Sequence, residues 1–570
     1  MPDLLHVDLT RRSATKGPLT VDHEMLGGHA LTSAIVAEEV DPKADPLAPD
    51  NVLVFAAGLY AGTMVPNGGR LSVGAKSPLT GGIKEANSGG STARTMSKLD
   101  LRGIKLTGRA DALSVVEIDA TGARVVPAGD LRGLGSYETV ARLREKYGDK
   151  VSIICIGPAG ELGFKAAAVI TTSPDFHLRA AARGGLGAVM GSKNVKAIVV
   201  DGEGGPGVKV ADRDGLKASS SALTKGILSH PAMAALEALG SPFLVNVTQS
   251  IGCLSTRNFS AGQFEGAQAI SGEHMAELLA ERPNAEAKHS CMAGCIVNCS
   301  QIYTDADGNE ITSGMEFETI GLIGANCAID DLDHIAKVDR LCDDLGLDTM
   351  EVGAALGVAM EGGMIPWGDG AAVRGLLGKL LDGDPNAALI ANGCCDTGEA
   401  LGVTRIPAVK RQGMAAYDPR VLKGTGTTYA TAPQGADHTC GNALPSPANP
   451  GYDPGSPEGQ AGMSEFLQCY FAAIDALGMC LFATLPALDM PELQGHFVAA
   501  VSAITGKELP EDYLISMGRD VVVMERDFNR RAGFTAADDR MPAFLLEEPV
   551  APSGNVYDVS DADLDAMFTS

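Results

Sequence analysis

Short apolar segments separated by turn residues dominate the first part of the chain. Glycine, proline and asparagine bound these segments, which is typical of strands joined by tight turns. Only one stretch there, from Tyr137 to Lys146, has apolar residues at clear helical spacing. The segments with strand-like patterning are 51–55, 70–74, 114–118, 151–155 and 195–200. A glycine-rich linker at 201–207 follows them, so the pattern predicts a β-rich N-terminal domain.

The pattern changes after residue 212, where apolar positions recur every three or four residues. The stretches with this helical spacing are 213–239, 274–281, 332–346, 349–363, 371–382, 461–487, 490–504 and 511–531. A glycine- and proline-rich region at 413–460 divides them, and within it 424–431 fits either a helix or a loop. The acidic stretch 559–565 has the composition of a solvated tail.

These patterns predict the fold class α+β, with a β-rich N-terminal domain followed by two mainly α-helical domains. The predicted domains are 1–205, with the β-rich pattern, 206–412, with three clustered cysteines, and 413–570, which contains His438. A ligand shared by the cysteines of the second domain and Cys480 of the third would join the two domains.

Composition narrows the class of partner. The chain has 570 residues and a net charge of −26, which disfavours a phosphate backbone, so no nucleic acid is expected. The N-terminus shows no basic segment followed by an apolar one, and no run approaches the about 20 apolar residues of a membrane span. We therefore expect a cytoplasmic protein whose 12 cysteines are metal ligands or reduced thiols.

Three cysteines, Cys291, Cys295 and Cys299, are spaced four residues apart. Thiolates are soft, anionic donors that suit iron–sulfur clusters and zinc, so this spacing favours one inorganic centre. Either centre needs a fourth ligand, and Cys480 is the best candidate. The alternative is that the three cysteines are small apolar side chains buried on one face of a helix.

A short motif of the form Asp-x-x-Gly-apolar-x occurs twice, as Asp343–Asp348 and as Asp475–Cys480. Each copy follows a helical stretch, so its glycine is predicted to end that helix in a left-handed cap. An aspartate fixed at a helix end can accept two parallel N–H bonds from a guanidine-like edge, such as that of a pterin ring. An ordinary helix cap explains a single copy, whereas two copies, one of them ending in cysteine, favour a functional role.

Two glycine-rich stretches, 181–193 and 69–90, expose backbone that could meet a ligand. In the first, Gly184 and Gly185 stand beside the cation of Arg183, which suits a phosphate or a bridging metal ion. It is neither a P-loop nor a dinucleotide-binding fingerprint, because the glycine and lysine spacings of those motifs are missing. Each stretch could instead form only a cluster of tight turns.

Taken in order, these motifs resemble those of the aldehyde:ferredoxin oxidoreductase family along essentially the whole chain. The matching stretches are Arg70, Lys76–Gly81, Asn87–Gly90, Arg183–Lys193, the three clustered cysteines, Glu316–Thr319, Asp343–Asp348, Tyr417–Arg420, Tyr429–Thr431, Gly435–His438 and Asp475–Cys480. Members of this family carry tungsten, occasionally molybdenum, in a bis-pterin cofactor beside one 4Fe–4S cluster. The resemblance implies that this cofactor is buried at the junction of the domains.

The resemblance also implies roles for individual residues. Asp343 and Asp475 would each hold one pterin, and Asn87 with the backbone near Gly184 would help bind a Mg²⁺ ion that links the pterin phosphates. Arg70 would donate hydrogen bonds to both a pterin and the cluster. The implied cluster ligands are Cys291, Cys295, Cys299 and Cys480. The implied cofactor-binding residues are Arg70, Asn87, Gly89, Arg183, Gly184, Gly185, Asp343, Leu347, Asp475 and Met479.

The activity that the resemblance implies is oxidation of an aldehyde and water to a carboxylic acid, with two electrons passed through the cluster to ferredoxin or an iron–sulfur subunit. Glu318 and His438 would face the metal and handle the protons that this chemistry releases. As plainer alternatives, Glu318 could be a surface carboxylate and His438 a hydrogen-bonding loop residue.

Two other functions stay open: the catalytic subunit of a complex that reduces acids or aromatic acyl thioesters, and a cofactor-free electron-transfer paralogue.

Three features depart from the family pattern. Three residues separate Cys291 from Cys295 where the family usually has two, which bears on the cluster type. A Glu-x-x-His motif that builds an iron site between subunits in some members is missing where expected, near 331–334, so a homodimer is left open. Cys440 stands where some members carry a basic residue, which would alter substrate preference.

Overall fold

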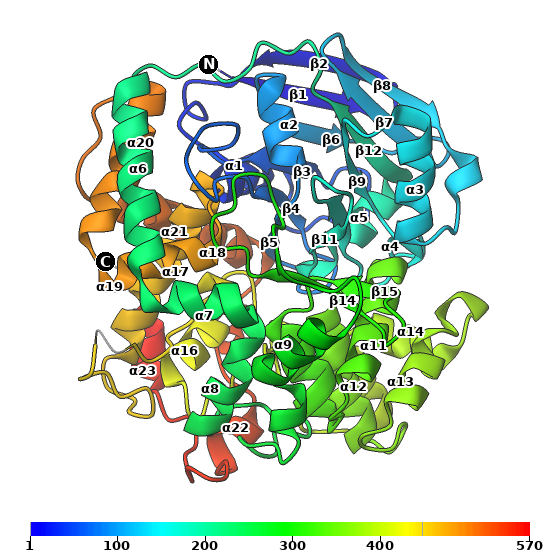
Figure 1. Cartoon of the computed structure of the whole chain (residues 1–570), viewed down its shortest axis with the longest axis vertical. Helices are drawn as coiled ribbons and strands as arrows, with labels where there is room; N and C mark the ends of the chain where they lie inside the picture. Colours follow the sequence, from blue (N-terminus) through cyan, green and yellow to red (C-terminus); the bar gives the residue numbers. More distant parts are fainter. Residues whose placement is uncertain (1, 447–448, 570) are drawn as a thin grey trace.

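Two six-stranded sheets form the N-terminal part of the protein in the computed structural model, which describes residues 2–446 and 449–569 (Figure 1). The first sheet has the order β2-β1-β6-β3-β4-β5 and contains β1 (Asp3–Asp8), β2 (Ser13–Pro18), β3 (Leu53–Ala57), β4 (Leu71–Lys76), β5 (Ile83–Ser88) and β6 (Leu101–Thr107). The second has the order β11-β10-β9-β12-β7-β8 and contains β7 (Ser114–Asp119), β8 (Gly122–Pro127), β9 (Val151–Cys155), β10 (Val169–Thr172), β11 (Leu178–Ala181) and β12 (Val195–Asp201). The five strands predicted from the sequence are confirmed as β3, β4, β7, β9 and β12.

The helices of this part are α1 (Gly28–Glu39), α2 (Thr92–Lys98), α3 (Ser136–Tyr147), α4 (Pro158–Glu161) and α5 (Leu186–Ser192). The predicted helix is confirmed as α3, which buries one face and exposes the other. Helix α1 was not predicted, because every residue from Gly28 to Val36 is buried and no polar face marks the helical period. It packs between the first sheet and the helices α17 and α21.

The remainder is mainly helical. Its elements up to residue 413 are α6 (Arg213–Ser229), α7 (Pro231–Leu239), α8 (Leu244–Ile251), α9 (Gly272–Glu281), β13 (Glu286–His289), β14 (Ser300–Thr304), β15 (Glu310–Ser313), α10 (Phe317–Thr319), α11 (Leu332–Leu345), α12 (Thr349–Glu361), α13 (Gly370–Leu377), α14 (Pro385–Ala391), α15 (Cys394–Leu401), β16 (Ala408–Val409) and β17 (Gln412–Gly413). Those that follow are α16 (Lys423–Thr431), α17 (Gln460–Leu477), α18 (Leu481–Thr484), α19 (Pro486–Asp489), α20 (Glu492–Thr505), α21 (Tyr513–Ala532), α22 (Ala543–Glu547) and α23 (Asp561–Ala566). The fold class is therefore α+β with a β-rich N-terminal part, whereas the domain boundaries at 205 and 412 stay predictions.

Three stretches differ from the sequence-based prediction. The helix predicted over 213–239 is broken at Pro231, which cannot continue the hydrogen-bond ladder of α6 and instead begins α7. The ambiguous stretch 424–431 lies in the fully buried helix α16. The predicted solvated tail is wrong, because it forms α23, in which Leu564 is buried and Asp565 pairs with Arg540 at 2.7 Å.

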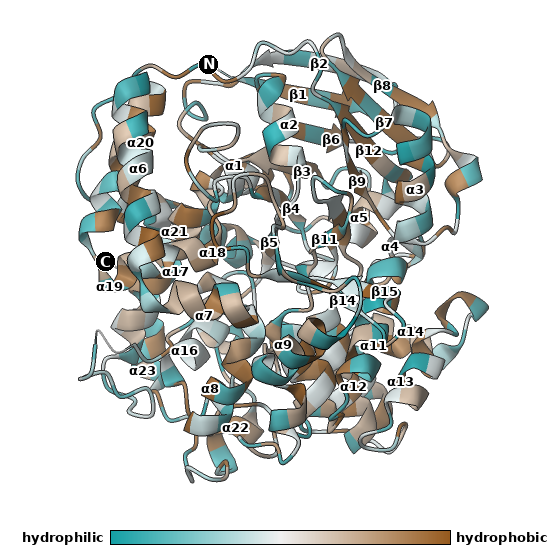
Figure 2. Ribbon diagram, in the orientation of Figure 1, coloured by the Kyte–Doolittle hydropathy of each residue, from teal (hydrophilic) through white to brown (hydrophobic). Residues whose placement is uncertain are grey.

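Long helices flank the sheets. Helices α6 and α20 pack side by side along one edge of the molecule, and α17 packs along α21 beneath them (Figure 1). Figure 2 shows β9 and β12 apolar along most of their length, whereas α6 and α20 alternate apolar and polar positions, as expected of helices with one face in solvent. No single helix within the described residues is long and apolar enough to span a membrane; α17 together with residues 481–489 passes that test only as a pair bent by 116°.

Candidate active site

A cavity of about 1360 Å³ lies where the β-rich part meets both helical regions. This volume exceeds the about 300–1,000 Å³ of most small-molecule sites, so the cavity has room for more than one organic ligand. The residues predicted from the sequence that line it are Arg70, Asn87, Gly89, Cys291, Cys299, Glu318, Asp343, Leu347, His438, Asp475 and Cys480. The predicted residues that do not line it are Arg183, Gly184, Gly185, Cys295 and Met479.

The three clustered cysteines lie in the loop between β13 and β14, and Cys480 follows the end of α17. Asn67 holds both segments: its N–H donates to the Gly294 carbonyl at 3.0 Å, and its carbonyl accepts from the N–H of Cys480 at 2.9 Å. The Asn67 side-chain Nδ2 donates to the Cys295 Sγ at 3.3 Å. One buried residue therefore joins the main chain of Cys480 to the triplet loop.

Burial raises the pKa of Cys291 to about 12, and the neighbouring Cys480 adds to that rise. Burial also raises the pKa of Cys480, which Arg70 partly offsets. Burial likewise raises the pKa of Cys299. Buried thiols with raised pKa values become thiolates only beside a strong positive centre, which suits a metal or a metal cluster. Gly89 completes this pocket, because a Cβ there would stand 3.0 Å from the Cys291 Sγ.

The two copies of the Asp-x-x-Gly motif end α11 and α17, and the predicted left-handed caps are confirmed. Gly346 has φ 71° and Gly478 has φ 72°. Each turn packs against a glycine that follows a strand: a Cβ on Gly157 would meet Gly346 N at 2.5 Å, and one on Gly58 would meet Gly478 N at 2.2 Å. Each sheet therefore supports one turn, at a distance that only glycine allows.

The carboxyl groups of the two turns have different neighbours. Burial and the nearby Asp339 raise the pKa of Asp343 well above its usual value, and Tyr137 donates its hydroxyl to Asp343 at 3.3 Å. Burial and Glu85 raise the pKa of Asp475 to about 8. Both groups lie at the cavity, so donors of a bound ligand would stabilise their ionised forms.

Glu318 and His438 meet across the same cavity. The His438 Nε2 lies 2.9 Å from the Glu318 Oε1, and the Tyr417 hydroxyl donates to that oxygen at 3.1 Å. Burial alone would raise the pKa of Glu318, but the nearby His438 and these hydrogen bonds outweigh it and hold the pKa below its usual value. Among the described residues no hydrogen bond reaches the His438 Nδ1, which leaves one buried polar atom for a ligand.

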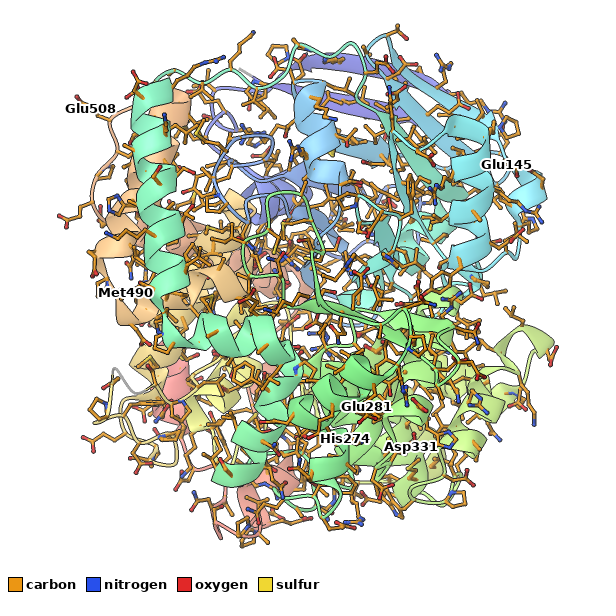
Figure 3. The ribbon with its side chains drawn as sticks, in the orientation of Figure 1. Glu145, His274, Glu281, Asp331, Met490 and Glu508 are labelled. Carbon is orange, nitrogen blue, oxygen red and sulfur yellow. The ribbon has the colours of Figure 1, made fainter. Side chains whose placement is uncertain are left out.

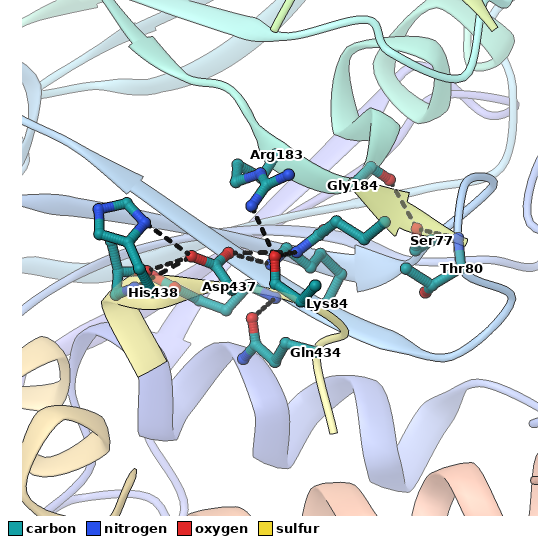
Figure 4. Close-up of polar contacts among 12 residues, drawn as sticks. Ser77, Thr80, Lys84, Arg183, Gly184, Gln434, Asp437 and His438 are labelled. Carbon is teal, nitrogen blue, oxygen red and sulfur yellow. Dashed lines mark hydrogen bonds and ion pairs between the residues drawn. The ribbon is translucent and has the colours of Figure 1, made fainter. Parts of the chain in front are cut away.

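Behind the cavity wall, buried ion pairs join distant segments (Figure 4). Lys84 pairs with Asp437 at 2.8 Å, next to His438 in the chain. Burial would raise the pKa of Asp437, but Lys84 and Arg183 hold it far below its usual value. Asp437 thus stays ionised, and it caps the short turn that presents His438 to the cavity.

Arg183 belongs to this buried layer. Its guanidinium donates to the carbonyls of Ala436 at 2.8 Å and Gly413 at 2.5 Å, and lies 3.4 Å from Asp348. The neighbouring Gly184 carbonyl accepts from Ser77 at 2.7 Å. These contacts brace the cavity wall, so the predicted role of Arg183, Gly184 and Gly185 at a phosphate or metal stays a prediction.

Residues 4–202 match the sequence model of the N-terminal domain of aldehyde ferredoxin oxidoreductase, and residues 219–570 match that of its domains 2 and 3. The chain belongs to the aldehyde ferredoxin oxidoreductase family. It is 34% identical over 557 residues to the tungsten-containing aldehyde ferredoxin oxidoreductase of Pyrococcus furiosus, covering 93% of this chain and 88% of the relative. It is equally 34% identical to the enzyme of the same name from Thermococcus kodakarensis, with the same coverage.

Two more distant proteins are also similar to this chain. The WOR-like subunit of an aliphatic sulfonate oxidoreductase from Pyrococcus furiosus is 25% identical, over 97% of this chain and 90% of its own. Among solved structures, the active site complex BamBC of benzoyl coenzyme A reductase, in complex with 1,5 dienoyl-CoA, superposes with a TM-score of 0.79. It is 20% identical and covers 95% of this chain and 90% of its own, which shows a shared fold.

Several residues of this family member act at the site without having been singled out from the sequence. Tyr417 and Asn67 contact Glu318 and Cys295, respectively, across long sequence separations. Glu316 lines the cavity, and burial together with the neighbouring Glu318 raises its pKa to about 7. The short stretch Glu316–Thr319, with two carboxylates around an aromatic residue, was the available signal for Glu316.

Proposed function

We propose that this protein is a tungsten bis-pterin oxidoreductase that oxidises aldehydes to carboxylic acids, with molybdenum as the alternative metal. Membership of a family whose curated relatives are tungsten-containing aldehyde ferredoxin oxidoreductases supports the class of reaction. The carrying observation is the Glu318–His438 pair, 2.9 Å apart, at a cavity that also contains Asp343, Asp475 and the cysteines. This chemistry requires three features at one cavity: an acid–base pair, two carboxylates at helix ends and a set of thiols.

The residues present fit the proposed groups. Cys291, Cys295, Cys299 and Cys480 would ligate a 4Fe–4S cluster. Asp343 and Asp475 would each accept hydrogen bonds from one pterin, because their raised pKa values signal carboxyl groups that lack compensating donors. Leu347, Gly89 and Arg70 would complete the walls, with Arg70 between a pterin and the cluster. Met479 stays a proposed cofactor-binding residue outside the cavity lining. Asn87 and the backbone near Gly184 and Arg183 would bind a Mg²⁺ ion between the pterin phosphates.

The bound tungsten centre would accept the two electrons of the reaction. The chain supplies the proton handling, since an aldehyde and water yield an acid, two electrons and protons. Glu318, held ionised by His438 and Tyr417, accepts a proton at Oε1 or Oε2. The two side chains are only 12% and 14% exposed, which limits contact with bulk water and strengthens these electrostatic interactions.

Electrons leave through the cysteine set. Cys480 is five residues beyond Asp475, so one turn contacts both proposed centres. Ferredoxin or an iron–sulfur subunit is the proposed acceptor, since low-potential clusters reach about −700 mV. The proposed substrate is a small aldehyde, and the proposed assembly is a homodimer in the cytoplasm.

Anaerobic assay of the purified protein against a panel of aldehydes, with a viologen as acceptor, tests the proposal. We expect aldehyde-dependent viologen reduction from protein that contains tungsten and iron. Reduction of an aromatic acyl thioester without aldehyde oxidation would instead support the reductase alternative. Iron without tungsten or molybdenum would support the electron-transfer alternative.

Glu318→Gln tests the proton acceptor. We expect kcat to fall by about 10²–10⁴-fold with metal content unchanged, the usual contribution of a general base. Because the pKa of Glu318 is lowered, wild-type activity is lost only as pH falls through that lowered value. Tyr417→Phe removes one hydrogen bond to the carboxylate and should move this acid limb to higher pH by about one unit. An unchanged pH profile would contradict the assignment.

A further inference from the structure

A second group of potential metal ligands lies outside the cavity, between the β10–β11 turn and the strand before the cysteine loop. Asp175 and His177 belong to the turn, and His289 ends β13. One ligand atom from each of the three lies within 4.8 Å of the others. The His177 Nε2 is 3.5 Å and the His289 Nε2 3.1 Å from the same oxygen, Asp175 Oδ2.

These separations match a coordination shell. Two ligands of a tetrahedral zinc ion with bonds of about 2.0–2.1 Å are about 3.4 Å apart. The two imidazole rings meet edge to face, 84° apart, so both can direct a nitrogen at one point without clashing. The Asp175 side chain is 47% exposed whereas that of His289 is 10% exposed, so an ion can enter from solvent and meet a fixed ligand.

The outer contacts of both histidines are those of metal-bound imidazoles. The His177 Nδ1 lies 3.3 Å from the Glu310 Oε1, and the His289 Nδ1 lies 3.2 Å from the Glu286 Oε2. A carboxylate at Nδ1 accepts the N–H there, fixes the tautomer and leaves the Nε2 lone pair free for a metal. Among the described residues the His289 Nε2 makes no hydrogen bond, so this mostly buried nitrogen is left for an added ligand.

We propose that Asp175, His177 and His289 bind one divalent transition-metal ion, zinc or ferrous iron, with water completing the shell. Two imidazoles and one carboxylate suit both metals. The ion would tie the β10–β11 turn to the segment two residues before Cys291, and so fix the entry to the cysteine loop. This site is independent of the aldehyde chemistry proposed above.

The test uses the holoenzyme, dialysed anaerobically against buffered zinc and then against metal-free buffer, with zinc and iron counted by mass spectrometry. We expect about one zinc per wild-type chain, at least tenfold less in His177→Ala, and unchanged cluster iron in both. His274→Ala is the matched control, because this histidine of α9, labelled in Figure 3, also pairs with a carboxylate, Glu277, at 3.4 Å. It should bind zinc like the wild type.

A second variant guards against a folding defect. Glu310→Gln keeps all three ligands and should weaken zinc binding by about tenfold or more, since it removes only the outer partner of His177. Absorption at the zinc edge should show nitrogen and oxygen neighbours. Equal zinc in His177→Ala and His274→Ala, no zinc in the wild type, or sulfur neighbours that place the ion at the cysteines would each overturn the site.

Discussion

The turns after α11 and α17 have the same backbone and different surroundings. Both end a helix at a left-handed glycine that packs on a glycine of a sheet, and both present an aspartate to one cavity. The first turn ends at Asp348, whose carboxylate caps α12 and faces Arg183. The second ends at Cys480, beside Arg70. The same turn thus has two different sixth residues: Asp348, which braces the cavity wall, and Cys480, the proposed cluster ligand.

Asp343 and Asp475, the first residues of the two motifs, also have different neighbours. Asp343 receives a neutral hydrogen bond from Tyr137 and feels the like charge of Asp339. Asp475 lies near His29 and Glu85, within 4.8 Å between ligand atoms, and in the field of Arg70. Each carboxyl group has at least one like charge and two cations nearby, Arg179 and Arg340 for Asp343 and His29 and Arg70 for Asp475. They differ in that Tyr137 donates to Asp343, whereas among the described residues no side-chain hydrogen bond reaches Asp475, so Asp475 depends more on donors from a ligand. The same substitution should cost more in the second turn.

The largest effect is expected from Cys480→Ala, which removes a proposed cluster ligand from the second turn. We expect loss of iron and a fall in aldehyde-dependent viologen reduction of about a hundredfold or more, since even outer-shell changes at metal sites cost about 10–100-fold. Iron analysis and electron paramagnetic resonance measure it. Cys469→Ala, on the preceding helix α17 and also buried, is the control and should keep its iron. A full complement of iron in Cys480→Ala would contradict the proposed difference between the two turns.

The next largest effect is expected on pterin binding in Asp475→Ala, which is compared with Asp343→Ala. Loss of hydrogen bonds to a charged group costs about 1.5–3 kcal/mol, so each variant should bind pterin about 10–150-fold more weakly. We expect Asp475→Ala near the upper limit and Asp343→Ala near the lower, measured as pterin and tungsten per chain. Asp520→Ala, at an exposed position of α21, should behave as the wild type. Equal losses of pterin in the two variants would contradict the difference between the two turns.

A smaller effect is expected from Tyr137→Phe, which removes the hydroxyl that donates to Asp343. The loss of about 1 kcal/mol should lower pterin retention about fivefold and leave iron content unchanged. Tyr147→Phe, at the other end of α3, removes a hydroxyl bonded to Glu117 and serves as the matched control. A similar change in both variants would mean that α3 was disturbed, and not the hydrogen bond to Asp343.

The smallest effect concerns the caps themselves. Gly402→Ala places a Cβ in open space at a left-handed cap of α15, so it should cost only about 1–2 kcal/mol of backbone strain. Gly346→Ala and Gly478→Ala add a clash, at 2.6 Å from Gly157 N and 2.8 Å from Gly58 Cα. Both should lower the melting temperature more than Gly402→Ala does. Equal decreases in melting temperature for all three variants would contradict the packing of the turns on the sheets.

The parts of the fold that could be predicted from the sequence are those that a local sequence signal marks. Gly346 and Gly478 mark their helix ends in the local sequence, because a left-handed residue that ends a helix is usually glycine. Helices α1 and α16 carry no such signal, since burial on all sides removes the polar face that marks the helical period. The contacts of Tyr417 and Asn67 join residues far apart in the chain, so only the folded structure reveals them.

Asn67 has a consequence for how the protein matures. Its main chain and side chain hold the triplet loop and Cys480 through hydrogen bonds that involve no metal. These bonds fix the positions of the two segments relative to each other through the polypeptide itself. The cluster proposed above would therefore bind to segments that are already ordered, with little ordering entropy left to overcome.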